Sequence, residues 1–480
     1  MKWALIHQGN DLMYGMTFFA NEVLKDGDGI HWFDGNKETV KLIEELQEFC
    51  PNYVCFGPLS SELLQANHIA FHVKRDVDAY TVFGGHHMNT LTDDFKHPHM
   101  DYIVKGPCYG AVNTIKTTSP GSTIHGCPQS PHLMRPSLKE YYEQVDIIRN
   151  RPRTYLMSHF GCCYNCSYCS TSSNRSKYRK QYKQCWLTRR PVEDVIEEAL
   201  IAKSYGIKEI AIADDDALYN CKPGQNGVQW WKEFYQQWHD KVNLPAYCNV
   251  TPKTVLKADE TAITCIALVC NSVQMGYETY SENSKKVFNR KFQTEDQVIA
   301  ACKRIGMHIK KIKLEVIVGL PNVDGLIEDP VEDAIQTVMS CQRIAQSGKN
   351  EHPEIEDVEI KAQCYPLMLY PGTILWDKCN EQGIKTVNAA WQYSFYAGKG
   401  SVEFPDKTKK KINNIVKMTT MFVKYNIGRD WMEALISMDM TQESSRKLSE
   451  CQYADSLIFR LGEEIKDSIP DIIKNMEFKY

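Results

Sequence analysis

The feature that most restricts the fold is an alternation of short apolar runs with amphipathic helical patterns over the first 116 residues. Five runs, rich in β-branched and aromatic residues, predict strands: WALIH (3–7), GIHWF (29–33), YVCFG (53–57), YTVFG (80–84) and DYIVKG (101–106). Strands that alternate with helices form parallel sheets with helices on both sides. Residues 1–116 are therefore predicted to be an α/β domain built on a parallel sheet.

The segment NKETVKLIEELQEFC (36–50) is a clear example of the intervening helices. Asn36 is a residue type that caps helix N-termini, and it precedes Val40, Ile43, Leu46 and Cys50 at helical spacing. We expect a helix that begins after Asn36 and buries these four side chains.

Small and polar residues follow the predicted strands of this first domain. They are Gln8-Gly9-Asn10, Gly57-Pro58-Leu59-Ser60-Ser61, Gly84-Gly85-His86-His87 and Gly106-Pro107-Cys108. Ligands of open parallel sheets bind beyond the carboxyl ends of the strands, where such residues let a ligand approach the backbone. The same residues are also common in ordinary turns, so by themselves they leave both interpretations open.

The rest of the chain divides into three regions. Residues 117–152 contain Pro120, Pro128, Pro131, Pro136 and Pro152 and are predicted to be a linker. The alternation resumes over 153–385, with strands expected in TYLMSHF (154–160), KEIAIADDD (208–216), CIALVCNSVQMGYE (265–278), KIKLEVIVGLP (311–321) and VEIKAQCYPLM (358–368). This region is predicted to be all or part of a parallel β/α barrel. Residues 386–480 lack the repeat and are predicted to be mostly helical, covering the site and selecting the substrate.

Composition indicates a globular protein and argues against several partners. Hydrophobic residues make up 43% and charged residues 24%, and the net charge of −4 favours neither nucleic acid nor an anionic membrane. No apolar run approaches the roughly 18 residues that span a bilayer. The start, MKWALIHQGN, lacks the long apolar segment of a signal peptide. We therefore expect a cytoplasmic protein that binds neither membrane nor nucleic acid.

Four cysteines lie close together in FGCCYNCSYCS (160–170): Cys162, Cys163, Cys166 and Cys169. They allow two spacings, C-x2-C-x2-C from Cys163 or C-x3-C-x2-C from Cys162. A structural zinc site normally uses two separated pairs, and the sequence has no second C-x-x-C pair. Three thiolates on one loop can instead hold an iron–sulfur cluster that keeps one iron open. A basic run follows and is expected to be a solvated face: Arg175, Lys177, Arg179, Lys180, Lys183, Arg189 and Arg190.

The spacing Cys162-x3-Cys166-x2-Cys169, with Tyr168 before the last cysteine and a strand before the first, resembles the radical S-adenosylmethionine (SAM) superfamily. The resemblance implies a partial (β/α)6 barrel with a 4Fe–4S cluster on Cys162, Cys166 and Cys169. It implies that SAM binds the open iron and is cleaved to a 5′-deoxyadenosyl radical, which abstracts hydrogen from the substrate. The reducing electron would come from a partner such as flavodoxin or ferredoxin.

Further segments over about 154–380 match this superfamily in the same order. Asp214-Asp215-Asp216 lie where relatives bind the amino group of SAM, and Asp214 and Asp215 are predicted for that role. Gly276-Tyr277-Glu278 and the later Arg290 match segments that relatives use around the ribose and carboxylate. Gly319-Leu320-Pro321 and Pro371-Gly372-Thr373 complete the series. The acidic residues are also common helix caps, and Arg290 also fits a surface salt bridge.

The first domain resembles the flavodoxin-like, Rossmann-type domain of the cobalamin-binding subclass, through VFGGHHMNTLTDDFKHPHMDYIVKG (82–106). This resemblance implies cobalamin contacts at Gly57, Ser60, Gly84, Gly85 and His87. The motif D-x-H-x-x-G is absent, so no lower cobalt ligand is predicted. Gly106-Pro107-Cys108-Tyr109 stands where the subclass commonly has G-E-G-E.

Together these features predict a cobalamin-dependent radical SAM methyltransferase that acts on an unactivated carbon of a small molecule or peptide. A cyclase, rearrangement or oxidation enzyme of the same architecture is the main alternative. A tRNA methylthiotransferase would need three more cluster cysteines in the first domain, and Cys50, Cys55 and Cys108 lie in unsuitable settings. The most distant alternative is a non-catalytic iron–sulfur redox protein. No catalytic residue is assigned, and the substrate stays open among peptides, natural-product intermediates and lipids.

Overall fold

The computed structural model describes residues 1–90, 97–127, 133–182, 187–291, 293–351, 357–386, 400–441 and 444–448. They form two compact units. Unit 1 contains Met1–Asp214 and Leu369–Asp377, and unit 2 contains Asp215–Met368, residues 378–386 and the described residues from 400 onward.

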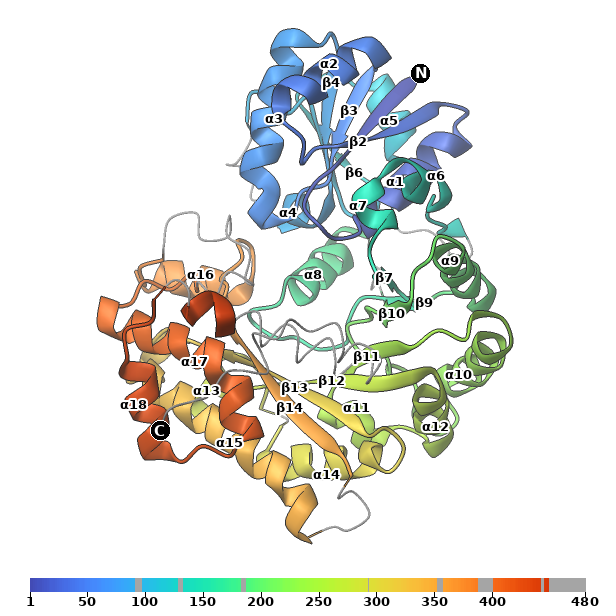
Figure 1. Ribbon diagram of the computed structural model, residues 1–480. Helices are drawn as coiled ribbons and strands as arrows, with labels where there is room; N and C mark the ends of the chain where they lie inside the picture. The colour runs from blue at the N-terminus through green and yellow to red at the C-terminus, as the bar shows by residue number, and fades with distance from the viewer. Residues whose placement is uncertain are drawn as a thin grey trace. The chain divides into compact units, whose positions relative to one another are not determined.

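Unit 1 begins with a six-stranded sheet in the order β2-β1-β3-β4-β5-β6 (Figure 1). Its strands are β1 (Lys2–His7), β2 (Gly29–Asp34), β3 (Tyr53–Phe56), β4 (Tyr80–Phe83), β5 (Tyr102–Lys105) and β6 (Ser122–His125). All of its pairings are parallel, with Trp3 aligned to Ile30 on one side and to Tyr53 on the other. The order reverses at β1, so the carboxyl ends of β1 and β3 lie at a switch point where such sheets bind ligands. The predicted flavodoxin-like sheet is confirmed.

The connecting helices are α1 (Tyr14–Lys25), α2 (Thr39–Phe49), α3 (Leu63–Asp76), α4 (Gly85–Thr90) and α5 (Ala111–Thr117). Helix α2 buries Leu42, Ile43 and Leu46, whereas Val40 is 69% exposed. The predicted apolar face was therefore wrong at Val40, because the buried stripe begins at Leu42. It was also wrong at Cys50, which is exposed because the helix ends at Phe49. Asn36 does not cap this helix; its amide nitrogen donates to the Gly9 carbonyl at 2.8 Å, and its Oδ1 accepts from the Gly9 N–H at 3.0 Å.

The segment predicted as a linker, 117–152, is partly structured. It contains β6, which pairs with β5, and the short helices α6 (Lys139–Gln144) and α7 (Asp146–Arg149). Tyr141 of α6 forms a 2.6 Å hydrogen bond with His7 Nδ1 at the end of β1. The first domain thus continues past residue 116. The edge strand β6 has only four residues and lies among prolines, so its alternation of side chains is too short to be recognised in the sequence. Pro128 and Pro131 lie outside the described residues.

A second sheet has the strand order β14-β13-β12-β11-β10-β7, and β10 pairs with β7, β11 with β12, β12 with β13 and β13 with β14 in parallel. These strands are β7 (Arg153–Leu156), β10 (Glu209–Ile212), β11 (Ala246–Val250), β12 (Cys270–Glu278), β13 (Lys311–Val318) and β14 (Glu359–Pro366). The expected parallel β/α region is confirmed with two corrections. Strand β11 was not predicted, and CIALV belongs to helix α12 (Glu260–Val269) rather than to a strand. Its apolar residues suit a buried helix as well as a buried strand.

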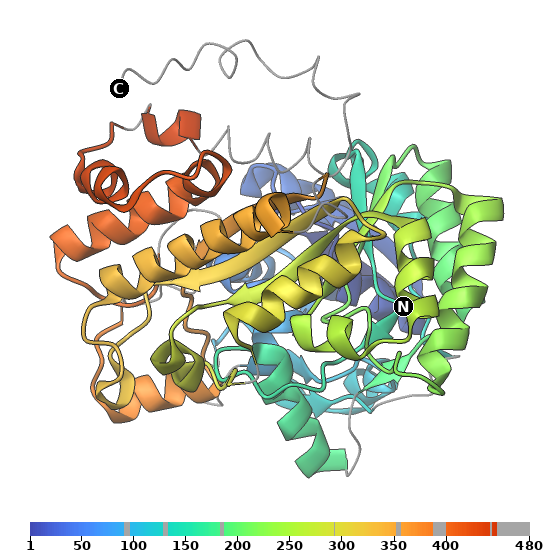
Figure 2. The ribbon, with the colours of Figure 1, turned by 90° about the horizontal axis from the view of Figure 1, so that it is seen from below.

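In unit 1, β8 (His159–Phe160) and β9 (Thr188–Arg189) form a small antiparallel ladder beside α8 (Ser170–Tyr182) and α9 (Val192–Ser204). The helices of unit 2 include α10 (Asn226–Gln237), α11 (Pro252–Lys257), α13 (Glu282–Val287), α14 (Glu295–Gly306), α15 (Pro330–Glu351), α17 (Asp406–Lys424) and α18 (Arg429–Ser437), and α16 (Ile374–Glu381) begins in unit 1. Helices α14 and α15 pack on β13, and α15 and α17 pack on β14, as Figure 2 shows for the yellow-to-orange part of the chain. Of the region predicted to be helical, 387–399, 442–443 and 449–480 lie outside the described residues.

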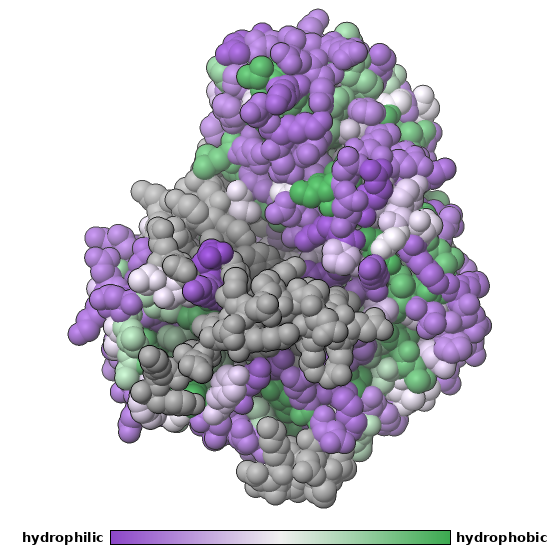
Figure 3. Space-filling model, in the orientation of Figure 1, coloured by the Kyte–Doolittle hydropathy of each residue, from purple (hydrophilic) through white to green (hydrophobic). Residues whose placement is uncertain are grey.

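None of the helices in the described ranges is long and apolar enough to cross a membrane. In Figure 3 the visible face of the first sheet and its helices is mostly hydrophilic, with single hydrophobic residues between polar ones. Isolated cysteines such as Cys55, Cys265 and Cys270 are buried, as expected for small apolar side chains.

Candidate functional site

The cysteine loop joins β8 to α8 in unit 1. It turns at Gly161, whose φ of 82° is a conformation that favours glycine. Cys166 is buried, Cys162 and Cys169 are half-buried, and Cys163 is exposed. No three His, Cys, Asp or Glu side chains in the described ranges gather closely enough to hold a single metal ion. Cluster thiolates bind separate irons, and three partly or fully covered thiols on one loop are a donor set that fits an iron–sulfur cluster.

Contacts within unit 1 hold this loop in place. Arg175 of α8 donates from Nη1 to the Cys162 carbonyl at 2.6 Å, and its other terminal nitrogen bonds to Asn165. The Tyr164 N–H approaches the Cys162 sulfur at 3.5 Å, the kind of contact that tunes a cluster thiolate. The Leu375 N–H donates to the Ser167 carbonyl at 2.8 Å. Arg175 therefore holds the loop and is not simply part of a solvated basic face.

Asp214, at the end of β10, is fully buried. Its Oδ1 accepts from the backbone N–H of Ser158 at 2.7 Å and of His159 at 3.1 Å, and its Oδ2 binds the Ser158 hydroxyl and lies 3.1 Å from His159 Nδ1. Burial alone would raise the pKa of this carboxyl, but His159, Arg189 and Ser158 outweigh it and lower the pKa to about 2. Asp214 is thus a structural anion that ties β10 to the strand before the cysteine loop.

The next two aspartates, in unit 2, differ from each other. Asp216 is buried and accepts hydrogen bonds from Thr251 at 3.0 Å and Thr254 at 2.9 Å, at the start of α11. Asp215 between them is exposed. Of the three predicted carboxylates, Asp215 is therefore the one presented outward, a distinction that sequence could not make.

Glu278 and Arg290 are brought together in unit 2. Glu278 ends β12 with a φ of 69°, and its Oε1 lies 3.6 Å from Arg290 Nη1. Arg290 is 4% exposed; it donates from Nη2 to the Gly276 carbonyl at 2.9 Å and from Nε to Gln293 Oε1 at 3.0 Å. The surface salt bridge considered for Arg290 is therefore excluded. A non-glycine residue in a left-handed conformation is a form of local strain that is common at ligand sites.

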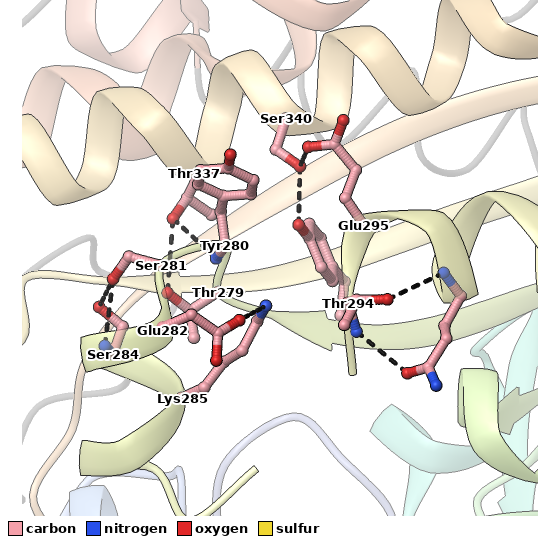
Figure 4. A network of polar contacts seen from close by, with 12 residues as sticks. Thr279, Tyr280, Ser281, Glu282, Ser284, Lys285, Thr294, Glu295, Thr337 and Ser340 are labelled. Carbon is pink, nitrogen blue, oxygen red and sulfur yellow. Dashed lines mark hydrogen bonds and ion pairs between the residues drawn. The ribbon is translucent and has the colours of Figure 1, made fainter. Parts of the chain in front are cut away.

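The end of β12 is tied to helices α14 and α15 (Figure 4). The Tyr277 hydroxyl bonds to Ser340 Oγ at 2.7 Å, and Ser340 donates to Glu295 at 2.6 Å. Beyond Glu278, the Tyr280 N–H donates to Thr337 Oγ1 at 3.3 Å. Polar side chains of two helices thus hold the strand end that carries Glu278.

In the first sheet, the predicted ligand loops after β3 and β4 meet. Ser60 Oγ forms a buried 2.8 Å hydrogen bond with His87 Nδ1. Gly85 has a φ of 83°, and a Cβ there would lie 3.0 Å from the Gly57 carbonyl oxygen. The Gly84 N–H donates to the Phe56 carbonyl at 2.8 Å. Five residues predicted on sequence grounds are therefore gathered at the carboxyl edge of one sheet, close to its switch point.

Replacement of Gly85 by alanine is expected to destabilise the protein by about 1–3 kcal/mol, because both the positive φ and the close Gly57 backbone oppose a side chain. Urea unfolding of the two proteins would measure this. Gly110→Ala is a matched control with a φ of 75° and no atom within 4 Å of the new Cβ. Equal losses in both variants would show that the contact with Gly57 contributes nothing.

The pKa of His87 is lowered to about 4, first by burial and then by His86. The unfolded chain binds a proton at this ring near pH 6.5, whereas the folded chain does so near pH 4. The contribution of the neutral ring to stability is therefore complete above pH 6.5 and declines as the pH falls toward 4. Between pH 7 and pH 5 we expect the cofactor-free protein to lose about 2 kcal/mol more than a His87→Gln variant. Unfolding curves at both pH values test this, and parallel pH dependences would contradict it.

Sequence reasoning missed a buried charge cluster formed by Arg190, Glu198 and Tyr14. Arg190 and Glu198 are 1% and 4% exposed and form an ion pair, Arg190 Nη1 donates to the Tyr14 hydroxyl at 2.8 Å, and that hydroxyl bonds to Glu198. Arg190 also donates to the Met157 carbonyl at 3.0 Å. The cluster therefore joins α1 to the segment just before the cysteine loop. The expectation that Arg190 lies on a solvated face was wrong, because its ion-pair partner is supplied by α9.

Residues 157–338 match the family model described as the Radical SAM superfamily. This region, with its parallel β/α strands and three-cysteine loop, is a radical SAM enzyme domain, a class that uses a 4Fe–4S cluster and SAM.

Two curated relatives are ribosomal protein uS12 methylthiotransferases RimO. That of Elusimicrobium minutum (strain Pei191) is 26% identical over 213 residues, covering 41% of this chain and 42% of that protein. That of Pelodictyon phaeoclathratiforme (strain DSM 5477 / BU-1) is 33% identical over 78 residues, 16% of each. The chain thus matches less than half the length of these relatives.

Solved structures resemble the chain over nearly its whole length. The cobalamin-dependent SAM radical enzyme OxsB, with aqua-cobalamin and SAM bound, has a TM-score of 0.62 at 12% identity, covering 98% of this chain and 75% of OxsB. The radical SAM methyltransferase TsrM from Kitasatospora setae, with cobalamin and a [4Fe-4S] cluster bound, has a TM-score of 0.62 at 14% identity. The match covers 98% of this chain and 99% of TsrM. The chain therefore has the fold of these enzymes.

Proposed function

We propose that this protein is a cobalamin-dependent radical SAM C-methyltransferase that methylates an unactivated carbon. The strongest support is that one chain contains both a radical SAM domain with a three-cysteine loop and a flavodoxin-like sheet. The predicted ligand loops of that sheet meet close to its switch point. TsrM, which has the same fold, is described as a methyltransferase with cobalamin bound.

Cys162, Cys166 and Cys169 are proposed to hold the cluster, with Cys163 outside it because its side chain is exposed. Bound there, the cluster would supply the electron that cleaves SAM. We infer that Arg175 and the Tyr164 N–H fix the position and charge of the first thiolate, through the contacts described above. A low-potential donor such as flavodoxin or ferredoxin is the proposed electron source.

For SAM, we propose that Asp215 receives the amino group, because its side chain is exposed whereas Asp214 and Asp216 are buried. Glu278 and Arg290 are proposed to contact the ribose and carboxylate. Arg290 is held by Gly276 and Gln293, so its guanidinium needs little reordering when a ligand binds.

For cobalamin, the proposed contacts are Gly57, Ser60, Gly84, Gly85 and His87. Gly57 and Gly85 let the two loops pack closely, because a Cβ on Gly85 would lie 3.0 Å from the Gly57 carbonyl oxygen. His87 is buried and bonded to Ser60, so we propose that it shapes the loop rather than binding cobalt. Cobalamin would supply a methyl carrier in this position.

Two other reactions are retained as alternatives. A cyclase, rearrangement or oxidation enzyme would use the same cofactors without adding carbon. The RimO matches favour methylthio transfer, but Cys55 is buried in β3 and Cys50 is exposed beyond α2, so these two cysteines of the first domain do not face one site. Product mass separates the three reactions, because only methylation adds one CH2.

The proposal is tested by anaerobic reconstitution of the full chain with iron, sulfide and hydroxocobalamin. After desalting, cobalt and iron per chain are measured, and SAM is added with a chemical reductant to detect 5′-deoxyadenosine. We expect cobalt near one per chain with both cluster absorbance and SAM cleavage. Cluster without cobalt would exclude the methyltransferase and favour a rearrangement or oxidation enzyme. Cluster without SAM cleavage would leave only a redox protein.

A further inference from the structure

Strands β13 and β14 of unit 2 have two contrasting faces. Ile312, Leu314 and Val316 are buried, and on β14 the Cys364 thiol lies against Thr419 of α17. Side chains alternate along a strand, so Lys313, Glu315, Gln363 and Tyr365 must lie on the opposite face, away from the helices. The inner face of a parallel barrel is usually packed with apolar side chains, and here it carries charges and amides instead.

These side chains form one network. Lys313 Nζ lies 3.0 Å from Glu315 Oε1 and donates to Gln363 Oε1 at 3.0 Å. With its amide oriented so that the oxygen faces Lys313, Gln274 on β12 accepts from Lys313 Nζ at 2.8 Å and donates to Glu315 Oε1 at 3.3 Å. The Tyr365 hydroxyl donates to Glu315 Oε1 at 3.3 Å. Lys313, with a side chain only 6% exposed, thus joins Glu315 to Gln363 and Gln274.

The network leaves two polar atoms for a ligand. Within the described part of the chain, the three contacts of Glu315 all end on Oε1, so Oε2 keeps its capacity to accept, and the side chain is 27% exposed. The amide nitrogen of Gln363, the register partner of Glu315, has no partner among the described residues. On the other side the register partner of Glu315 is Gly276, and Glu278 Oε1 lies where a side chain on Gly276 would begin, 2.8 Å from the position of its Cβ.

We propose that this face binds the substrate through a protonated amine on Glu315 Oε2 and an adjacent oxygen on the Gln363 amide nitrogen. The substrate class is therefore a polar amine, such as an amino acid derivative or an amino sugar, and not an acyl chain. Charge-assisted hydrogen bonds are the strong ones, and an apolar chain laid on this carboxylate would bury an unpaired charge. Gly276 also accepts from Arg290, which places this substrate group beside the proposed SAM contacts. The inference rests on the proposed function.

The test is calorimetric titration of the reconstituted full chain, with SAM bound, against matched probes. The pairs are leucinamide with 4-methylpentanamide, tyramine with 4-ethylphenol, and glucosamine with glucose. We expect at least one amine to bind on the order of tenfold more tightly than its partner, and Glu315→Gln to remove that preference. Glu381→Gln, at an exposed position on α16, makes the same charge change and should preserve it.

Glu315→Asp keeps the charge that balances Lys313 but places the carboxylate one methylene further from the ligand. The variant should therefore fold, and it should still bind the amine probe more weakly. Equal binding within every pair, or no amine binding at all, would overturn the proposal. Weaker SAM binding in Glu315→Gln would overturn it as well, by assigning the network to SAM. Cluster content and SAM cleavage are measured on the same samples, so failure of the proposed function would appear in the unmodified protein itself.

Discussion

Each of the variants Cys162→Ala, Cys166→Ala and Cys169→Ala is expected to lose the cluster and to form 5′-deoxyadenosine only at background level. A cubane that depends on three protein thiolates cannot keep its open iron in place with two. The measurements are iron and sulfide per chain, visible absorbance, and chromatography of the products formed from SAM and reductant. No other single substitution considered for this protein should reduce activity as much.

Cys163→Ala is the matched control, since it removes a neighbouring thiol that is exposed while the three proposed ligands are partly or fully covered. It should retain iron and SAM cleavage close to those of the unmodified protein. If Cys163→Ala lost the cluster and Cys162→Ala kept it, the ligand spacing would be C-x2-C-x2-C, and the assignment of the first ligand would be wrong.

Arg190→Met is expected to lower the free energy of unfolding by about 3–5 kcal/mol, because it leaves the Glu198 carboxylate buried without its cation. Burial already raises the pKa of Glu198, against the opposing effect of Arg190, so removing the cation should raise it further. Denaturation by urea, followed by tryptophan fluorescence, measures the loss.

The double variant Arg190→Met/Glu198→Met distinguishes an unpaired charge from lost packing. It should recover much of the stability, because a buried ion pair replaced by apolar side chains of similar size is often neutral. Arg429→Met is a surface control: its partners Glu332 and Glu433 are accessible, and exposed pairs contribute about 0–1 kcal/mol. If the double variant were no more stable than Arg190→Met, the hydrogen bonds of Arg190 to backbone carbonyls would account for the loss instead.

The β/α alternation and the cysteine spacing could be recognised without a structure because both are short-range patterns. Strand and helix periods are set by neighbouring residues, and three ligands on one loop need no distant partner. The errors came where local patterns are ambiguous. The apolar segment CIALV suits helix and strand alike, and the four-residue strand β6 is too short to show a period.

Among the predicted ligands, the sequence indicated a group of candidates and only the tertiary structure separated them. Three consecutive aspartates are chemically identical in sequence, yet Asp214 meets the Ser158 segment, Asp216 meets the start of α11, and Asp215 is exposed. Likewise, Arg290 could be a surface residue or a buried one until the fold brought it to Glu278 and Gly276.

By itself, then, the sequence determined the α/β class, the two β/α regions and the cysteine loop, because these follow from contacts between residues near one another in the chain. Only the tertiary structure decided that Arg190 pairs with Glu198, that Ser60 meets His87, and that Lys313 and Tyr365 both contact one oxygen of Glu315. Those facts depend on strand register and burial, which bring together residues with no signal in common along the chain.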